Sequence, residues 1–352
     1  MSPVDSLPRS QTSLKIAVMG SGSWGTTFAK VLGDAAGTSE EQRDVVLWAR
    51  RSEVAEEINR EHRNHRYLQD TVLPGAVRAT DRVEDALSDA DVVVLAVPAQ
   101  SLREQLRVWK DFVSPTALVV SLMKGLERGT DERMSQVIAQ EWEADEDRIL
   151  VLSGPNLALE IAREEPTASV VACSDEQAAH YVAELCTAPY FRPYTSSDVV
   201  GVEIGGIVKN VIALAVGICE GRAMGDNTKA SVITRGLAET TRLAIALGGE
   251  AHTLAGLAGL GDLVATCASS LSRNHTAGKL LGQGLTLPEV VERMTQTAEG
   301  VKSAEAVQEL AARNGVEMPI TAAVVAVLDG RLAVDELGPL LLNRSLKSED
   351  GY

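Results

Sequence analysis

The sequence predicts an α/β domain with a doubly wound, mostly parallel sheet, followed by an all-helical second domain. The N-terminal half alternates short, contiguous apolar runs with helical stretches, which is the pattern of a parallel sheet covered by helices on both faces. After about Thr195 the chain changes to long segments rich in Ala and Leu and punctuated by Gly, which is typical of packed helices. The length of 352 residues is sufficient for two domains.

Each expected strand is short, apolar and rich in β-branched residues: 14–19, 45–49, 91–97, 117–122 and 149–153. The helices expected between them cover 26–32, 52–61, 101–112 and 131–142. Strands that alternate with helices imply right-handed crossovers. Residues 167–172 and 190–194 could extend the sheet at one edge. We therefore place the first domain at residues 14–196 and the helical domain at 197–342, with a flexible extension at 1–13 and a polar tail at 343–352.

Charge and composition exclude several classes of function. The chain has 33 Lys and Arg residues against 49 Asp and Glu residues, a formal charge of −16, which disfavours nucleic acid and anionic membrane surfaces as partners. The apolar stretch at 204–219 is interrupted by Lys209, so no segment reaches the ~18 apolar residues that span a bilayer. The N-terminus also lacks the apolar core of a signal peptide, and we expect a cytoplasmic protein.

The four cysteines contain no C-x-x-C pair and have no histidine at ligand spacing. This pattern predicts free, buried thiols in a reducing compartment and no metal site.

A glycine-rich turn follows the first expected strand. Gly20, Gly22 and Gly25 form a Gly-x-Gly-x-x-Gly sequence that opens a helix. In a dinucleotide-binding turn the first glycine permits the turn, the second lets a pyrophosphate approach the backbone, and the third lets helix and strand pack closely. The strands on either side favour this interpretation over a glycine-rich turn without a ligand, and make the first domain Rossmann-like.

The end of the second expected strand bears on the choice of cofactor. Sites that select NAD place Asp or Glu there, whereas this chain has Arg50 and Arg51. Two guanidinium groups suit a 2′-phosphate, so NADP(H) is preferred and NAD(H) remains possible. The alternative is that the two arginines are the solvated start of the next helix.

Four further groups of residues are candidates for substrate chemistry. Lys124 follows a strand, at the end where doubly wound sheets bind ligands. Lys209 lies in an otherwise apolar helical segment, where an ammonium must be paired or serve in catalysis. Asp262 could orient a lysine or bind a substrate hydroxyl, and Arg273 with Asn274 could clamp a phosphate. We expect the last two groups in polar loops between helices. For each residue the alternative is a structural ion pair, a helix cap or a surface contact.

Taken together, the motifs resemble the bacterial NAD(P)-dependent glycerol-3-phosphate dehydrogenases, from Lys15 to about Leu328. The resemblance rests on these blocks in this order: Gly20-x-Gly22-x-Trp24-Gly25-Thr26, Lys124-Gly125-Leu126-Glu127, Ser153-Gly154-Pro155, residues 203–211, Gly225-Asp226-Asn227-Thr228-Lys229-Ala230, Arg235-Gly236-Leu237-Ala238-Glu239, Gly261-Asp262-Leu263, Ser272-Arg273-Asn274 and Glu299-Gly300.

The resemblance implies roles for individual residues. Lys209 would be the general acid–base at the substrate carbonyl. The substrate would contact Lys124, Gly154, Asn156, Lys209, Asp262, Ser272, Arg273 and Asn274. The dinucleotide would contact Gly20, Gly22, Ser23, Trp24, Gly25, Arg50, Arg51, Lys124, Ala158, Arg273 and Glu299. Asn156 departs from the family, which has Ser or Thr after Gly-Pro; an amide can still donate a hydrogen bond.

The resemblance implies the reversible reduction of dihydroxyacetone phosphate to sn-glycerol 3-phosphate. This product would supply phospholipid biosynthesis. We expect the enzyme to be a homodimer. Two alternatives remain open at this point. One is another two-domain dehydrogenase that acts on a hydroxy acid or sugar acid. The other is a non-catalytic module that senses NADP(H).

Overall fold

The computed structural model describes residues 3–6, 13–37, 42–294 and 298–337. The chain divides into two compact units. The first contains Met1–Met123 and Arg133–Val199, and the second contains Lys124–Glu132 and Val200–Tyr352. The sequence placed this division a few residues earlier and did not predict that Lys124–Glu132, here called the strap, groups with the helical unit. The expected polar tail at 343–352 lies outside the described residues.

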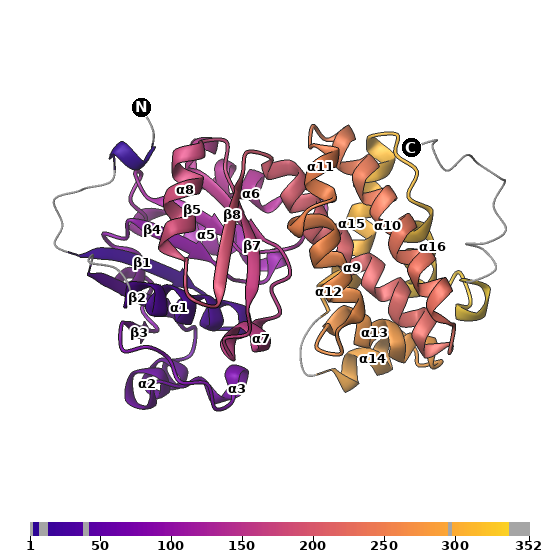
Figure 1. Ribbon diagram of the computed structural model, residues 1–352, viewed down its shortest axis with the longest axis horizontal. Helices are drawn as coiled ribbons and strands as arrows, with labels where there is room; N and C mark the ends of the chain where they lie inside the picture. The colour runs from indigo at the N-terminus through magenta and orange to yellow at the C-terminus, as the bar shows by residue number, and fades with distance from the viewer. Residues whose placement is uncertain (1–2, 7–12, 38–41, 295–297, 338–352) are drawn as a thin grey trace. The chain divides into compact units, whose positions relative to one another are not determined.

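An eight-stranded sheet forms the centre of the first unit (Figure 1). Its strands are β1(Leu14–Met19), β2(Arg43–Trp48), β3(Val77–Thr80), β4(Val92–Leu95), β5(Leu118–Ser121), β6(Ile149–Ser153), β7(Thr167–Ala172) and β8(Phe191–Ser196). Their order is β3-β2-β1-β4-β5-β6-β7-β8. Strands β1 to β6 are parallel, β7 is antiparallel to β6, and β8 is parallel to β7. The predicted doubly wound sheet with an extended edge is confirmed.

Strand β3 was not predicted. It has only four residues and lies at the edge of the sheet, so only Val77 and Ala79 of its residues are buried. A strand this short does not produce the contiguous apolar run that marks the central strands.

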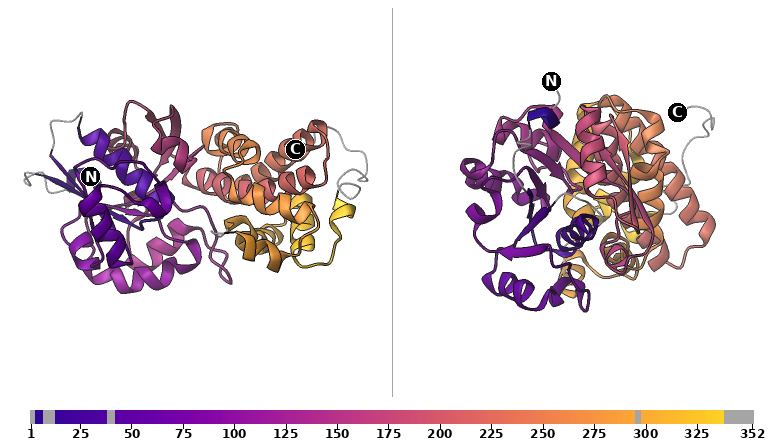
Figure 2. Two further views of the ribbon diagram at one scale, coloured as in Figure 1. Left: turned by 90° about the horizontal axis from the view of Figure 1, so that it is seen from below. Right: turned by 60° about the vertical axis from the view of Figure 1, so that its left-hand side comes forward.

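Helices cover both faces of this sheet, as the two views in Figure 2 show. They are α1(Ser23–Ala36), α2(Ser52–Glu61), α3(His65–Leu68), α4(Val83–Leu87), α5(Leu102–Trp109), α6(Met134–Trp142), α7(Ala158–Ala162) and α8(Glu176–Leu185). One buried cluster contains α1 and α8, and another contains α5 and α6. Short 3-10 turns lie at η1(Pro3–Ser6), η2(Ala99–Ser101), η3(Lys110–Phe112) and η4(Glu146–Arg148). Within the expected flexible extension, η1 packs Val4 against the first cluster.

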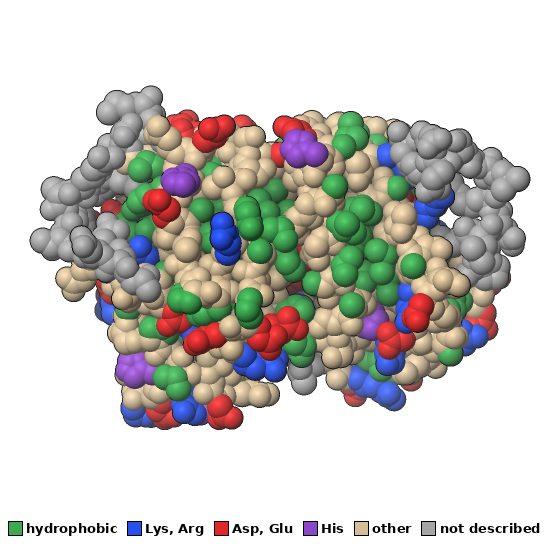
Figure 3. Space-filling view, in the orientation of Figure 1, with side chains coloured by type: hydrophobic (Ala, Val, Ile, Leu, Met, Phe, Trp, Pro, Cys, Tyr) green, Lys and Arg blue, Asp and Glu red, His purple; other side chains and the backbone are tan. Residues whose placement is uncertain are grey.

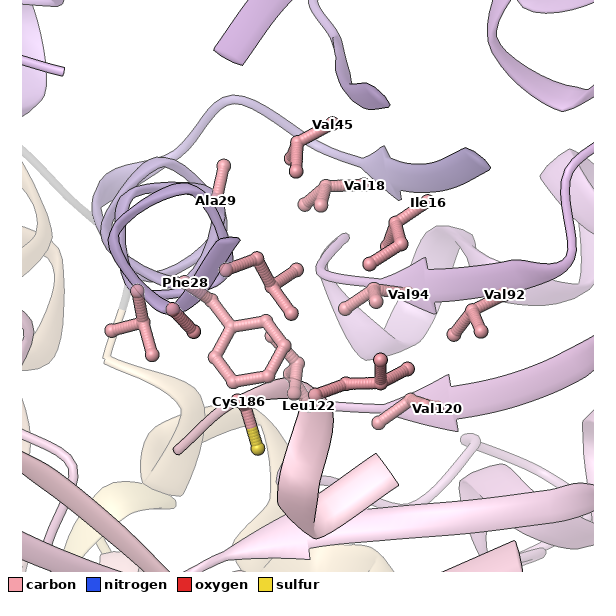
Figure 4. Packing of buried hydrophobic residues seen from close by; sticks show 14 of the residues in the cluster. Ile16, Val18, Phe28, Ala29, Val45, Val92, Val94, Val120, Leu122 and Cys186 are labelled. Atoms are coloured by element: carbon pink, nitrogen blue, oxygen red, sulfur yellow. The ribbon is translucent and has the colours of Figure 1, made fainter. Parts of the chain in front are cut away.

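The packing of α1 onto the sheet fixes the position of the glycine-rich turn. Phe28 projects from α1 into a cluster that includes Val18 of β1, Val94 of β4 and Val120 of β5 (Figure 4). Phe28 is 1% exposed, and burial of a side chain of this size stabilises the fold by about 1.5 to 3 kcal/mol. The helix that opens the turn is therefore anchored to the strand that precedes it.

The second unit is helical, as predicted. Its helices are α9(Val199–Gly221), α10(Asp226–Ala246), α11(Ala251–Leu254), α12(Asp262–Ala268), α13(Arg273–Gly282), α14(Leu287–Arg293), α15(Glu299–Arg313) and α16(Pro319–Leu328). A π-helical turn, η5(Leu257–Gly261), precedes α12, and a 3-10 turn lies at η6(Val334–Glu336). Helix α9 is buried from Gly201 to Cys219 and forms the centre of the unit.

The expectation that no segment is long and apolar enough to span a bilayer was wrong. Val199–Gly221 and Ala251–Ala268 are both long and apolar enough to do so. Lys209 does not interrupt the first helix, because its ammonium is paired within the unit. The apolar window of the first is 89% buried, as in the core helix of a globular unit, and that of the second is 39% buried.

Candidate active site

The backbone of the glycine-rich turn fits a bound pyrophosphate. Gly20 follows β1 with a φ of 130°, a conformation that side chains other than glycine rarely adopt. A Cβ atom on Gly25 would lie 1.9 Å from the carbonyl oxygen of Gly20, whereas a Cβ on Gly22 would meet nothing within 4 Å. The first and third glycines therefore shape the turn, and the second leaves open space beside the backbone.

The start of α1 leaves polar groups for an anionic ligand. Gly22 is its N-cap, makes no side-chain cap, and the first turn has no acidic residue. Free N–H groups at a helix N-terminus attract phosphate. The indole Nε1 of Trp24 is also buried and has no hydrogen-bond partner within the described ranges. These features fit the dinucleotide predicted for the turn.

Asn64 supports the glycine-rich turn from outside it, and no motif in the sequence points to this residue. It is fully buried, and its Nδ2 donates to the carbonyl oxygen of Ser21 at 3.0 Å and to Oγ1 of Thr26 at 2.9 Å. Asn64 lies between α2 and α3, far along the chain from the turn, so only the tertiary structure brings them together.

Arg50 and Arg51 follow β2, where the sequence placed them. Arg50 is exposed and Arg51, the N-cap of α2, is partly exposed. Neither guanidinium forms an ion pair or a hydrogen bond with any residue that the structure describes. Two such arginines remain available to a phosphate group.

The loop between β6 and α7 brings together the other candidates of the first unit. Gly154 has a φ of 138°, and Asn156 has a buried Nδ2 and a buried Oδ1 that both lack hydrogen-bond partners among the residues that the structure describes. The Ala158 carbonyl accepts a hydrogen bond from Oγ1 of Thr27 in α1 at 3.2 Å. The amide of Asn156 is therefore free to bind a ligand, as its place in the motif implies.

Two lysines share one aspartate in the second unit. Nζ of Lys209 lies 2.5 Å from Oδ1 of Asp262, and Nζ of Lys124 lies 2.6 Å from Oδ2. The Asp262 side chain is only 1% exposed, and a buried carboxylate requires such charged partners. The hydroxyl oxygen of Thr266 accepts from Lys209 at 2.7 Å.

This arrangement defines what each lysine can do. Burial, assisted by the nearby Lys209, lowers the pKa of Lys124 to about 8, and Asp262 opposes that shift. A lysine ammonium has three N–H donors, and Lys209 uses two on Asp262 and Thr266. The third N–H points to what the group can do chemically: a lysine held in this way can donate to a ketone oxygen.

Thr266 was not identified from the sequence. It lies one helical turn after Asp262 in α12, and residues at this spacing share a helix face. The relation was missed because Asp262 was expected in a loop. Asp262 instead begins α12, and Arg273 begins α13, so both expected loops are helix N-termini.

At the start of α13, the side chains of Ser272 and Asn274 bind other parts of the protein, whereas the sequence predicted that Arg273 and Asn274 together clamp a phosphate. Ser272 is the N-cap and accepts from the backbone N–H of His275 at 3.2 Å. Nδ2 of Asn274 donates to Oδ1 of Asn210 at 2.8 Å, and Oδ1 of Asn274 accepts from the N–H of Gly300 at 2.8 Å. The Asn274 amide thus joins the helix that carries Lys209 to the start of α15, and Arg273 is the exposed cation of this group.

Glu299 is the first residue of α15 and precedes Gly300. Its Oε2 is buried, and no residue in the described part of the chain forms a hydrogen bond with it. Burial raises the pKa of Glu299, while Lys302 and Arg273 oppose the shift. An orphaned carboxylate oxygen can accept a hydrogen bond from a ligand.

Comparison with known proteins agrees with this geometry. Residues 15–179 match the family described as NAD-dependent glycerol-3-phosphate dehydrogenase N-terminus, and residues 198–338 match its C-terminus. A glycerol-3-phosphate dehydrogenase (NAD(P)+) of Thermobifida fusca is 57% identical over 335 residues, which cover 95% of this chain and 98% of that protein. A protein of the same name from Streptomyces griseus is 55% identical over 340 residues, which cover 96% of this chain and 98% of that protein.

Among solved structures, the chain is similar to a crystal structure of glycerol-3-phosphate dehydrogenase from Coxiella burnetii. The two are 34% identical with a TM-score of 0.87, over 95% of this chain and 100% of that one. Both family models match, and two relatives are more than half identical over nearly their whole length. The chain therefore belongs to the NAD-dependent glycerol-3-phosphate dehydrogenase family.

Proposed function

We propose that this protein is an oxidoreductase that reduces dihydroxyacetone phosphate to sn-glycerol 3-phosphate with NADPH or NADH. The observation that carries the proposal is the Lys209–Asp262–Lys124 group, in which one buried carboxylate holds two ammonium groups. Such a group can stabilise negative charge on an oxygen and supply a proton to it. Family membership supports the identity of the ketone, which the side chains alone do not specify.

The second unit would bind and polarise the ketone. The remaining N–H of Lys209 donates a hydrogen bond to the carbonyl oxygen and then its proton, so that the oxygen, still bonded to its carbon, becomes the hydroxyl of the product. Lys124 places a second ammonium group beside the Asp262 carboxylate. Asp262 and Thr266 hold the Lys209 ammonium in place. Arg273 and the backbone N–H groups at the start of α13 bind the phosphate.

The first unit would bind the dinucleotide. When bound, NAD(P)H supplies the hydride that reduces the ketone carbon. The turn at Gly20, Gly22 and Gly25 holds its pyrophosphate, and Ser23, Trp24 and Ala158 line its binding site. Arg50 and Arg51 pair with the 2′-phosphate, so NADPH is favoured over NADH. Gly154 and Asn156 are the substrate contacts proposed for this unit. Glu299, a residue of the second unit, is a further proposed contact of the dinucleotide.

The proposed product is the backbone of phospholipids, which supports a role in phospholipid biosynthesis. We also propose that the enzyme is a cytoplasmic homodimer with no membrane or nucleic-acid partner, the last supported by its formal charge of −16.

The loss of NADPH absorbance on addition of dihydroxyacetone phosphate tests the proposal. Turnover is expected with this ketone and with NADPH in preference to NADH, whereas hydroxy-acid or sugar-acid precursors should give little. Tight NADPH binding without turnover of any of these substrates would contradict the proposal and favour a cofactor-sensing module.

A further inference from the structure

Lys124 reaches Asp262 from the first position of the strap. The strap, Lys124–Glu132, is nine residues long and contains no helix or strand. Because no regular hydrogen-bond ladder orders the strap, its side-chain contacts with the second unit hold Lys124 beside the Asp262 carboxylate. We call these contacts the fixed points of the strap. One is Leu126, which is fully buried in the hydrophobic core of this unit.

The second fixed point is Arg313, the last residue of α15. Its guanidinium forms an ion pair with Asp131 of the strap and donates to the carbonyl oxygen of Thr130 at 3.2 Å. The Arg313 side chain is 53% exposed, but the Asp131 side chain is only 3% exposed. A carboxylate buried to this extent is costly without its cation.

The backbone at this contact is also held in an unfavourable conformation. Asp131 has a φ of 57°, which a residue other than glycine rarely adopts and which persists only where its surroundings enforce it. The strap closes on itself there, because the N–H of Asp131 donates to the Glu127 carbonyl oxygen at 2.9 Å. The Arg313 contact thus secures the turn whose other end leads to Lys124.

Helix α15 connects this contact to the candidate phosphate site. Its first turn holds Gly300, whose N–H binds Asn274, and its last residue is Arg313. Along the same helix, Lys302 accepts a hydrogen bond at its carbonyl oxygen from Nε of Arg128 in the strap, at 3.2 Å. One rigid helix therefore positions both the strap and the start of α13.

We propose that Arg313 is a positioning residue for catalysis: through Asp131 it fixes the strap so that Lys124 remains on Asp262 beside Lys209. The kinetic part of this inference rests on the proposed function. The structural part, that Arg313 orders the strap, does not.

Hydrogen exchange measures the structural part without any substrate. In Arg313→Ala, amides of the strap should exchange faster by about tenfold or more, since local opening sets the exchange rate. Arg313→Lys should restore much of the protection. The matched control is Arg222→Ala, which removes another exposed arginine from a long-range ion pair, with Asp335, and should leave strap exchange unchanged. Unchanged strap exchange in Arg313→Ala would overturn the inference even in an active enzyme.

Kinetics measures the catalytic part. Arg313→Ala should lower kcat about tenfold, because small misplacement of a catalytic group has effects of this order, while KM for NADPH stays the same. In a Lys124→Ala background the same change should have no further effect on kcat, which is the coupling expected of two residues acting as one unit. Additive losses, or an equal loss in Arg222→Ala, would overturn the inference. A wild-type enzyme without turnover would instead contradict the proposed function and leave the exchange result to decide the role of Arg313.

A variant pair separates positioning from stability. Arg313→Ala leaves Asp131 buried and unpaired and should lower Tm, whereas Arg313→Ala with Asp131→Asn removes both charges and should recover part of it. The double variant should still have the low kcat and the fast strap exchange. Recovery of kcat together with Tm would overturn the inference, because the loss would then come from stability alone.

Discussion

Lys209 is a charged side chain in a helix whose other residues from Gly201 to Cys219 are almost all apolar, and Asp262 with Thr266 makes its burial tolerable. Lys209→Ala should lower kcat by about 10² to 10⁴, the usual contribution of a positioned acid–base group. The affinity for NADPH should stay nearly unchanged, because the dinucleotide turn belongs to the other unit. Steady-state kinetics and NADPH titration of the same preparation test both parts. Near-normal kcat would remove Lys209 from the catalytic role.

Lys124 should determine the alkaline limit of ketone reduction. Its pKa is lowered to about 8, and the positive form is the one that stabilises charge on the substrate oxygen. As pH rises through this value the ammonium is lost, so kcat/KM for dihydroxyacetone phosphate should fall about tenfold per pH unit above it. In Lys124→Arg the limit should move to higher pH, whatever the absolute activity, because a guanidinium stays charged. An identical pH profile in wild type and variant would exclude Lys124 as its origin.

Arg50 and Arg51 should set the cofactor preference. Replacement of both by Gln should raise KM for NADPH more than KM for NADH, because only NADPH carries the 2′-phosphate. The difference should shrink as added salt screens the charges. The ratio of kcat/KM values for the two cofactors, measured at two ionic strengths, tests this. Parallel weakening of both cofactors would assign the arginines to the adenine or to the start of α2.

At the scale of elements, α9 and α13 cross so closely that only glycine fits between them. A Cβ on Gly278 would lie 2.1 Å from the carbonyl oxygen of Leu214, and one on Gly217 would lie 2.1 Å from that of His275. These two helices carry Lys209 and Arg273. The crossing thus couples packing in the core to the positions of two candidate site residues.

Gly278→Ala should therefore destabilise the protein and impair substrate use together. The added methyl group would clash with the backbone of Leu214 in α9, which cannot rotate away as a side chain could. The two helices must therefore move apart, and this lowers the free energy of unfolding by about 1 to 3 kcal/mol. KM for dihydroxyacetone phosphate should rise because Arg273 moves with α13. Gly225→Ala is the control, since a Cβ there meets nothing within 4 Å. Equal denaturation midpoints and KM values for the two variants would show that the crossing tolerates a methyl group.

At the scale of the whole molecule, the four cysteines behave as the sequence predicts. Cys173, Cys186, Cys219 and Cys267 are free and buried. Burial raises the pKa of all four thiols, to about 11 for Cys173 and about 12 for Cys186 and Cys267. Thiolates are the reactive form, so a colorimetric thiol reagent should react slowly with the native protein and with all four cysteines after denaturation. A fast-reacting thiol in the native enzyme would contradict this prediction.

The surface charge agrees with a small-molecule substrate rather than a polyanion. The formal charge is −16, and among the described residues on the face in Figure 3, basic side chains lie interspersed with acidic ones. A dispersed arrangement lacks the continuous positive surface that phosphate backbones require. In the proposed function the anionic ketone and cofactor are bound by local groups, Arg273 and the start of α1.

The sequence by itself determined the class of fold and most of the central strands, because contiguous apolar runs that alternate with helical stretches have few other solutions. It also determined the glycine-rich turn, since a positive φ at Gly20 and the close contact at Gly25 are local requirements. The family resemblance identified Lys209, Lys124 and Asp262 as members of one site.

Only the tertiary structure decided how those residues act on one another. Lys124, Lys209 and Asp262 come from three separate segments, and no spacing in the sequence indicates that one carboxylate binds both ammonium groups. Thr266 was missed because Asp262, one helical turn before it, was expected in a loop, whereas Asn64 and Arg313 were missed because each contributes through a partner elsewhere in the chain. The same holds for Asn274, whose amide binds Asn210 and Gly300. Pairing of buried charges depends on which segments the fold brings within about 3 Å, and that is a property of packing and not of periodicity.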